Sequence, residues 1–583
     1  MNKRIANIEN FLGKLSYLPL IIFILFFLIA NIYWVKENRF DQILDIDESG
    51  YISYSLTLQN SFKAQGLSGF LNALAQPVTF APLVPAIASL GISLSNSTGN
   101  MVLLTNTFIC ALLFITIYQI GLIISGKAAA ISSVLLAASI DSIGLHTRTF
   151  SFSISAALFF ALAVLSFIKC TSFTNRKWSA YLGASLAFMI LSRTMTLAFL
   201  PSFFIVICLS IHFRNKSTPV RIHFANLILA FASFILIAAP WYLLNFRTVF
   251  GYLFSFGFGK RASEYGSDLG FLTLENFFDR ASRLADSYGL VPMLVLVLIF
   301  LLIVLQIKKH HFKDTKFKTS LIFQISILIA ITFFTLFTSR NRGFGFEVPF
   351  ISIISTILLS SFFNFYKSFY WRVLVCAGIT TLYFGMFYFN FNTTNCQNLN
   401  TKIHFPFLGP KALLECHTPL HRYVAGFCVE CMEKTNKKEP IFSKTMAIKW
   451  KTLNAEIADF VFKHNVKRKT TSFASRHSLM NVNSVQLELI KRHSEAFPFI
   501  QIEPNVILNS IDGYRDWILN TEKNNSCYIV LLNNNWGEFS PYPNIKFINN
   551  ALIALNYKDI KQIETPTVGQ SVNIWFKENL NCK

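Results

Sequence analysis

The chain has 583 residues, of which 53% are hydrophobic and only 14% charged, and its formal net charge is +22. A soluble globular protein carries about a quarter charged residues, so this composition excludes an ordinary soluble enzyme. The basic residues concentrate in short segments between apolar runs, which favours a membrane topology over nucleic-acid binding.

Apolar runs of about 20 residues recur along the chain, and each is long enough to cross a bilayer as a helix. The first run, residues 17–35, has no small-residue cleavage site behind it, so we interpret it as a retained anchor. Eleven helices are predicted, at residues 17–35, 100–125, 128–141, 152–168, 179–192, 195–212, 223–243, 289–307, 319–338, 348–365 and 372–389.

The charges between these helices predict an orientation. The segments on the amino-terminal side hold 17 basic and 2 acidic residues, whereas the opposite loops hold 11 basic and 12 acidic residues. Basic loops resist translocation and stay in the cytoplasm. We therefore predict a multi-pass protein of the cell inner (plasma) membrane, with a cytoplasmic amino terminus and an extracytoplasmic carboxyl-terminal domain.

Two parts follow from this pattern. Residues 1–390 are predicted to form a helical membrane domain with a long first external loop, 36–99, whose mixed apolar and polar residues indicate short interfacial helices. Residues 391–583 are predicted to form an extracytoplasmic (periplasmic) α/β domain. Its expected helix spans 443–465, and its expected strands lie at 470–475, 499–502, 527–532 and 572–576.

Cysteine usage agrees with an exported carboxyl-terminal part, because six cysteines follow the last predicted helix. Six thiols in an oxidising compartment predict disulfides, although their pairing stays open. Zinc is the alternative, since Cys428 and Cys431 form a CxxC pair, but a second pair at finger spacing is missing. The six are Cys396, Cys416, Cys428, Cys431, Cys527 and Cys582.

The first external loop carries a pair of carboxylates, Asp47 and Glu48, just after the first helix. A carboxylate that is partly desolvated at a membrane face can have a raised pKa and act as a general base. The alternative is a solvated acidic loop shared with Asp41 and Asp45, which we expect to be simple loop charges.

Four segments share an order known from one group of membrane enzymes. They are Asp47-Glu48 followed by Tyr51, then Phe80-Ala81-Pro82-Leu83-Val84-Pro85, Leu191-Ser192-Arg193 and Ala239-Pro240-Trp241 with Asn245 and Arg247. This order resembles the GT-C superfamily of membrane glycosyltransferases, of the protein O-mannosyltransferase and lipid A aminoarabinose transferase type. The resemblance covers most of residues 15–365.

The resemblance implies a function. Such an enzyme transfers a sugar, with inversion, from a polyprenyl phosphate donor to a hydroxyl of a glycan, lipid or protein acceptor at the outer membrane face. Asp47 would be the general base, Glu48 would shape the catalytic site and Tyr51 would contact substrate. Arginine binds phosphate with paired hydrogen bonds. The basic residues expected to bind the donor are Arg148, Arg193, Arg247, Lys260, Arg261 and Arg342.

Those basic residues lie on the predicted outer side, although Lys and Arg are usually enriched in cytoplasmic loops. Their position therefore suggests a specific role. The alternative to phosphate binding is that they extend to the interface or pair with loop acids such as Glu347.

The chain also departs from the family pattern. Many relatives carry an acidic residue in the second outer loop near the start of the fourth helix, but the stretch 146–151 has none, and the nearest acid is Asp141, several residues earlier. No metal ligand is therefore assigned and no cofactor is certain, while a divalent metal stays open as an alternative. His146 is expected to be a polar loop residue with its hydrogen bonds satisfied.

Two other classes of function stay open. A membrane transporter or flippase of lipid-linked sugars would place ionisable residues near helix midplanes, whereas the charges here fall almost wholly at predicted helix ends. A non-catalytic envelope assembly protein would use the carboxyl-terminal domain only for binding.

The predicted orientation is testable by fusion. Because of the basic excess in the assigned inner loops, alkaline phosphatase fused after residue 583 should be active in a bacterial host. A green fluorescent protein at the same position should stay dark. A bright fluorescent fusion with inactive phosphatase would reject the orientation.

Overall fold

The computed structural model of the protein describes residues 17–95, 100–213, 218–257, 273–309, 321–338, 345–366, 368–391, 402–405, 409–412, 442–502, 510–523, 526–533 and 544–578. The chain forms two compact units, each treated by itself below. The first unit comprises residues 1–33, 75–84 and 104–418, and the second comprises residues 34–74, 85–103 and 419–583.

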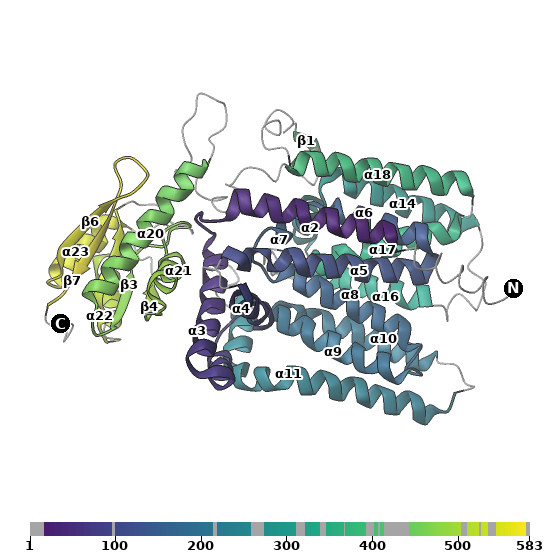
Figure 1. Ribbon diagram of the computed structural model, residues 1–583, viewed down its shortest axis with the longest axis horizontal. Coiled ribbons are helices and arrows are strands. Elements are labelled where there is room, and N and C mark those ends of the chain that lie inside the picture. The colour runs from purple at the N-terminus through teal and green to yellow at the C-terminus, as the bar shows by residue number, and fades with distance from the viewer. Residues whose placement is uncertain are drawn as a thin grey trace. The chain divides into compact units, whose positions relative to one another are not determined.

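All eleven predicted helices are present (Figure 1). They are α2 (Leu18–Arg39), α5 (Thr105–Ser125), α6 (Lys127–Ala138), α8 (Ser153–Cys170), α9 (Arg176–Ser192), α10 (Leu200–His212, preceded by the 3-10 turn η2, Thr194–Phe199), α11 (Val220–Gly257), α14 (Leu290–Lys309), α16 (Leu321–Thr338), α17 (Val348–Phe365) and α18 (Phe369–Phe391).

Among the described residues, seven helices are long and apolar enough to cross a membrane. The number rises to nine if two bent pairs each count as one span: α6 with α7 (Asp141–Thr147), bent by 69°, and α13 (Leu274–Tyr288) with α14, bent by 108°. The predicted class, a polytopic helical membrane protein with a sheet-containing carboxyl-terminal region, is confirmed. Eleven spans stay a prediction.

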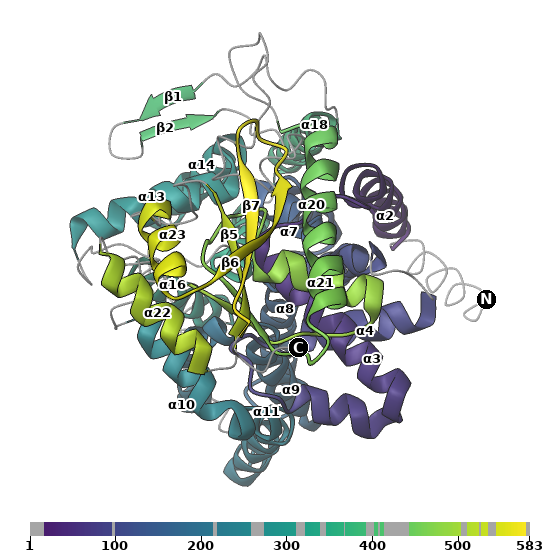
Figure 2. The same ribbon diagram turned by 90° about the vertical axis from the view of Figure 1, so that its left-hand side faces the viewer.

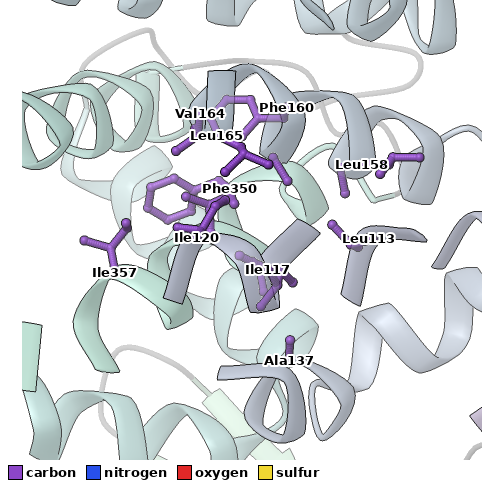
Figure 3. Packing of buried hydrophobic residues seen from close by; sticks show 14 of the residues in the cluster. Leu113, Ile117, Ile120, Ala137, Leu158, Phe160, Val164, Leu165, Phe350 and Ile357 are labelled. Atoms are coloured by element: carbon purple, nitrogen blue, oxygen red, sulfur yellow. The ribbon is translucent and has the colours of Figure 1, made fainter. Parts of the chain in front are cut away.

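The core of the helical unit is formed by side chains of α5, α6, α8 and α17 (Figure 3). The most apolar stretch of α8 is 83% buried and that of α17 is 78% buried, so these two helices lie inside the bundle. Figure 3 shows Ile117 and Ile120 of α5 near Val164 and Leu165 of α8, with Phe350 of α17 beside them. Dispersion contacts between such side chains, together with small residues, hold helices together in a bilayer.

Small residues let some helices approach closely. A Cβ atom at Gly183 of α9 would collide with the backbone carbonyl of Ala230 in α11. Glycine at this position is therefore needed for the α9–α11 contact.

The longest helix, α11, has 38 residues and contains Pro240 in its interior. A proline inside a helix removes one backbone hydrogen bond and favours a kink. The helix continues to Gly257, beyond the predicted end at residue 243. The added turns include Phe246, Phe250 and Phe254.

The predicted short helices of the first external loop are present. Helix α3 (Ile46–Leu74) is kinked at Gly66, whose φ is 63°, and α4 (Leu83–Ser95) follows, with the 3-10 turn η1 (Asn100–Leu104) behind it. Helices α7 and α13 occupy stretches that we predicted as loops, and that prediction was wrong. Both are too short or too polar to stand out as apolar runs, and α13 is strongly amphipathic.

The carboxyl-terminal part of the second unit contains a five-stranded sheet in the order β4-β3-β5-β7-β6. Strands β3 (Thr470–Phe473), β4 (Phe499–Gln501) and β5 (Ser526–Leu532) are parallel, whereas β7 (Ser571–Phe576) runs antiparallel to both β5 and β6 (Lys558–Glu564). A separate antiparallel hairpin, β1 (Lys402–Phe405) with β2 (Gly409–Ala412), belongs to the first unit.

Helices cover both faces of this sheet (Figure 2). Helices α22 (Ile511–Lys523) and α23 (Ile545–Ala554) pack on one face through a core that includes Trp517, Ile548 and Ile529. Helices α20 (Lys444–His464) and α21 (Val482–His493) lie on the other side (Figure 2). Every residue of β5 is buried, as expected for a central strand covered on both faces. The predicted α/β arrangement is therefore present.

The four predicted strands correspond to β3, β4, β5 and β7, and the predicted helix to α20. Strand β6 was not predicted. It lies at the edge of the sheet, six of its seven residues are exposed, and Lys558, Asp559, Lys561 and Glu564 interrupt any apolar pattern. Charged residues on an edge strand oppose pairing with another chain.

The loop between β3 and α21 contains a buried histidine, His477, which is only 1% exposed. Its ring stacks on Trp450 with the ring centres 4.8 Å apart. Its Nδ1 accepts hydrogen bonds from the backbone N–H groups of Leu479 and Met480, each at 3.2 Å. Burial disfavours the charged imidazolium and lowers the pKa of His477 to about 3.

This histidine should make the stability of the α/β domain depend on pH. In the unfolded chain His477 takes up a proton below about pH 6.5, whereas in the folded chain it stays neutral until about pH 3. Stability should therefore fall as the pH falls through this window, by at most about 1.4 kcal/mol per pH unit. Urea-dependent pulse proteolysis of the full-length protein in detergent, from pH 7 to pH 4, measures it.

The matched control is the exposed His464 of α20. His477→Gln should have a flatter pH dependence than the wild type, and His464→Gln should keep the wild-type slope. Equal slopes in all three proteins would contradict the assignment.

Candidate functional site

Most of the predicted site residues that the structure describes fall into two groups, one in each compact unit. The acidic turn comprises residues 39–51 of the second unit, between the end of α2 and the second turn of α3. The polar cluster belongs to the first unit and consists of Asn106, His146, Arg148, Ser151, Ser153, Arg193 and Gly345.

The acidic turn is shaped by a left-handed residue and a helix cap. Asp41 has a φ of 57°, which reverses the chain after α2. Asp45 then caps α3: its Oδ1 accepts the N–H of Asp47 at 3.0 Å and its carbonyl accepts the N–H of Ser49 at 2.9 Å. Carboxylates in the first turn of a helix are stabilised by the helix dipole. The sequence thus places Asp47 and Glu48 where negative charge is favoured.

Glu48 forms an ion pair with Arg39, and the pair is almost completely buried, with side-chain exposures of 6% and 0%. Removing one partner of a buried pair leaves an uncompensated charge, which is strongly unfavourable. Arg39 ends α2 and Glu48 begins α3, so this ion pair joins the two helices. Glu48 is therefore built into the structure of the turn.

Asp47 differs from its neighbour, because its side chain is exposed. Tyr51, one turn further along α3, is half-buried. The structure thus brings Asp47, Glu48 and Tyr51 together in the first two turns of one helix, with only Asp47 open to solvent.

Asp41 accepts a hydrogen bond from Asn100 Nδ2 at 2.9 Å, and Lys451 Nζ lies 3.5 Å from its Oδ1. The Asn100 hydrogen bond, followed by the nearby lysines, lowers the pKa of Asp41 below its usual value. The Asp41 side chain is 77% exposed, as expected of a loop charge, although it is also hydrogen-bonded to Asn100, while Asp45 has the further task of capping α3.

In the first unit, Asn106 organises the loop between α7 and α8. Its side-chain amide nitrogen donates toward three backbone carbonyls, of His146 at 3.2 Å, Thr149 at 2.6 Å and Ser151 at 2.8 Å. Asn106 itself is completely buried at the start of α5. Because unpaired carbonyls are costly inside a membrane protein, this contact fixes the loop conformation.

His146 and Arg193 lie in the same polar cluster. His146 Nδ1 hydrogen-bonds with Ser151 Oγ at 2.9 Å, and Arg193 Nη1 donates to Ser153 Oγ at 2.6 Å. Gly345 has a φ of +72°, and a Cβ there would collide with both His146 and Ser153. The cluster therefore joins the first turn of α8, the end of α9 and the start of α17, with His146 hydrogen-bonded as expected.

The other predicted basic residues lie in different environments. Arg148 is 2% exposed, and its Nε donates to Asn31 Oδ1 of α2 at 3.0 Å. Arg247 is exposed on α11. Lys260, Arg261 and Arg342 lie outside the described residues. Arg148 and Arg193 thus lie in the polar cluster, while Arg247 is placed on a separate helix.

Three of the sequence segments that suggested the family meet in the first unit. Asn245 is completely buried and its Oδ1 accepts the N–H of Val78 at 3.1 Å. Trp241 and Leu191 are buried together, with Leu83 packed against them. These contacts join the Pro-Trp…Asn segment, the Leu-Ser-Arg segment and the segment around Pro82.

Metal and cysteine chemistry complete the description. Within the described ranges, no group of three or more His, Cys, Asp or Glu side chains is placed to hold a metal ion. The free cysteines among these residues are Cys110, Cys170, Cys208 and Cys376, all in helices of the first unit. Of the six cysteines expected to form disulfides, only Cys527, buried in β5, is described. Disulfides therefore stay a prediction.

Sequence reasoning missed Arg39, Asn106 and Asn31. Each is a single polar residue at or near the end of an apolar helix, where polar residues are common and carry no specific pattern. Asn245 lay within a quoted segment, but the sequence did not show that its side chain binds residues 75–84.

The family comparison supports the resemblance that these segments suggested. Residues 77–242 match the family described as dolichyl-phosphate-mannose-protein mannosyltransferase. A search of the curated proteins gives no match.

Solved structures share the fold over nearly the whole chain. ArnT from Cupriavidus metallidurans in the apo state is 13% identical, with 95% of this chain and 97% of that chain covered and a TM-score of 0.51. ArnT bound to undecaprenyl phosphate is 12% identical, with 95% and 98% covered and a TM-score of 0.50. An oligosaccharyltransferase from Archaeoglobus fulgidus, in its complex with zinc and sulfate, also matches, at 11% identity, 87% and 67% coverage and a TM-score of 0.44.

The chain is therefore a polytopic membrane protein with the fold seen in ArnT. The resemblance predicted from the sequence is confirmed, and residues 77–242 are its most recognisable part.

The ion pair in the acidic turn gives a prediction about stability. Glu48→Gln removes the carboxylate from the buried pair with Arg39 and should cost about 3–5 kcal/mol. The double variant Arg39→Met/Glu48→Leu should recover most of that loss. Thermal unfolding of purified protein in detergent, together with the yield of folded protein, measures both.

Asp47→Asn is the matched control, because it removes a neighbouring charge that is exposed. It should cost less than about 1 kcal/mol, the usual size of a helix-dipole contribution. A Glu48→Gln protein as stable as the wild type would show that the ion pair contributes little.

Proposed function

We propose that the protein is an inverting glycosyltransferase of the inner (plasma) membrane. It takes a sugar from a polyprenyl phosphate donor and transfers it, at the outer face, to a hydroxyl of a glycan, lipid or protein. The observation that carries the proposal is the ArnT fold over 95% of the chain, with the family-like segments packed together in the helical unit.

The comparisons support the kind of donor. The matching family is described as using dolichyl phosphate mannose, and ArnT has been solved with undecaprenyl phosphate bound. Both lipids are polyprenyl phosphates, and both belong in a bilayer.

The proposed reaction is a direct displacement at the anomeric carbon. The acceptor oxygen forms a bond to that carbon, the bond from the carbon to the phosphate oxygen breaks, and polyprenyl phosphate leaves with the bonding electron pair. The proton of the acceptor hydroxyl passes to Asp47. Asp47 is exposed, so a substrate hydroxyl can reach it, but it lacks the partial desolvation that the sequence led us to expect of the base.

Arg193 is the best supported phosphate ligand. Arg193 is half-buried, and its guanidinium donates through Nη1 to Ser153 Oγ and through Nη2 toward Met195 Sδ. Guanidinium groups bind phosphate with two parallel hydrogen bonds. We assign Arg247 a weaker contribution from its exposed site, and Lys260, Arg261 and Arg342 remain candidates. Arg148 is assigned mainly to holding α2 through Asn31.

A transporter remains the second class, but no observation favours it specifically. Asp141, His146 and Arg148 are buried, yet they lie in or beside the short helix α7 and not near the middle of a long span.

The proposed base gives the main test. Asp47→Asn keeps the shape of the side chain but does not accept the proton, so turnover should fall by about 10²- to 10⁴-fold. The assay uses purified protein in liposomes with undecaprenyl phosphate mannose, glucose or aminoarabinose, and with lipid A, oligosaccharide or peptide acceptors. Transfer is followed by mass spectrometry.

Two further variants make the outcome specific. Asp516→Asn, an exposed carboxylate on α22, should keep wild-type turnover. Arg193→Ala should mainly weaken donor binding, and Arg193→Lys should recover only part of it. Normal turnover in Asp47→Asn would remove this residue as the base, and no transfer with any donor would count against the function itself.

A further inference from the structure

Lysine side chains of the carboxyl-terminal α/β domain donate hydrogen bonds to backbone carbonyls in and beside the acidic turn. Lys444 Nζ of α20 donates to the carbonyl of Glu37 at 3.1 Å, before the turn. Lys451 Nζ, two turns further along α20, donates to the carbonyl of Asp41 at 3.2 Å. All four residues belong to the second unit, although about 400 residues of sequence separate the partners.

Helix α21 contacts the other side of the turn. Asn483 Nδ2 donates to the carbonyl of Ile46 at 3.0 Å, and Asn60 Nδ2 of α3 donates to the carbonyl of Ser494 at 3.4 Å. Figure 1 shows α21 beside α3. Because Ile46 is the residue directly before Asp47, the Asn483 contact acts on the peptide group that leads into the proposed base.

Gly50 permits this close approach. A Cβ at Gly50 would lie 2.9 Å from Asn483 Nδ2, closer than real Cβ contacts, and 3.1 Å from its Cγ, so the Asn483 side chain would have to shift. The glycine lies one turn after Ile46, on the side of α3 that faces Asn483. The contact therefore depends on two residues. Gly50 leaves space for the Asn483 side chain, and the Asn483 amide donates the hydrogen bond to Ile46.

The contact between Asn483 and Ile46 lies at the edge of the sheet where open α/β sheets usually bind a ligand. The chain passes from β3 to β4 on one side of the sheet, whereas β5 is followed by β6 and β7 on the other side, so the topological switch point lies between β3 and β5. Ligands of open α/β sheets bind beyond the carboxyl ends of the strands at that point. Here the first turn of α21, which follows β3, contacts the first turn of α3.

We propose that the α/β domain is a positioning domain for the acidic turn, and that Asn483 is the positioning residue that orients Asp47 through the carbonyl of Ile46. The segment from α2 to α3 takes the place of a ligand at the carboxyl edge of the sheet. This inference rests on the proposed function, because it concerns the orientation of the proposed base.

Asn483→Asp tests the proposal with little change in shape, since it replaces the donating amide by an acceptor facing a carbonyl. Displacements of about 1 Å cost up to about 10²-fold in rate, so kcat should fall between about 10- and 100-fold while the KM for the donor stays unchanged. The assay uses the full-length protein in liposomes and the donor and acceptor pair that supports transfer in the panel above. Asn550→Asp, exposed on α23, is the matched control and should change neither value.

A double-mutant cycle separates positioning from general damage. If Asn483 acts through Asp47, then Asn483→Asp should change the residual turnover of Asp47→Asn by less than about 2-fold. The same loss in both backgrounds would overturn the proposal, as would unchanged kcat in the single variant. Asn483→Gln, which keeps a donor, should recover part of the rate.

Hydrogen exchange gives a readout that needs no substrate. The backbone amides of residues 46–52 should exchange several-fold faster in Asn483→Asp than in the wild type or in Asn550→Asp, because the first turn of α3 loses a contact. Unchanged exchange would overturn positioning even if transfer is established. A different outcome is faster exchange in Asn483→Asp together with normal turnover in Asp47→Asn. That outcome would reject Asp47 as the base, and with it the assignment of Asn483 as its positioning residue.

Discussion

The buried ion pair between Arg39 and Glu48 is the interaction on which the acidic turn depends. Both charges are buried, so separating them is costly, and the pair holds the end of α2 against the first turn of α3. Asp45 then caps the new helix, and the exposed carboxylate of Asp47 follows from that geometry. Two adjacent acidic residues thus have different tasks, because one faces the interior and the other faces solvent.

In the helical unit, neutral side-chain amides pair the buried polar groups of the backbone. A loop at the end of a membrane helix must pair its backbone carbonyls without water, and Asn106 does so for the loop between α7 and α8. Asn245 plays the opposite part in the segment before α4, where its Oδ1 accepts the backbone N–H of Val78. Buried amides, which are neutral at every pH, therefore fix the loops that carry Arg148, Ser153 and the segment around Pro82.

The sequence predicted the helices and strands that are marked by apolar patterns, and it missed the features that depend on contacts between distant residues. The eleven helices and four of the five strands of the main sheet were found, because burial requires apolar runs. Helix α13 and strand β6 were missed, since one has only a narrow apolar face and the other lies exposed at an edge. For the site, Asp47 and Glu48 were found from their order in the chain. Their different burial, and the partners Arg39 and Asn483, depend on contacts over distances in sequence that no local pattern records.

The length of α11 has a consequence for the surrounding lipid. At 1.5 Å per residue its 38 residues extend about 57 Å, whereas the hydrocarbon layer is about 30 Å thick. Large apolar side chains remain exposed from Phe224 to Phe254, near both ends of the helix. A strong tilt or a local thickening of the bilayer is needed to cover them, and each costs a fraction of a kcal/mol per Å of mismatch. The acyl-chain length of the surrounding lipids sets the bilayer thickness, so it should influence the free-energy cost of placing α11 in a given membrane.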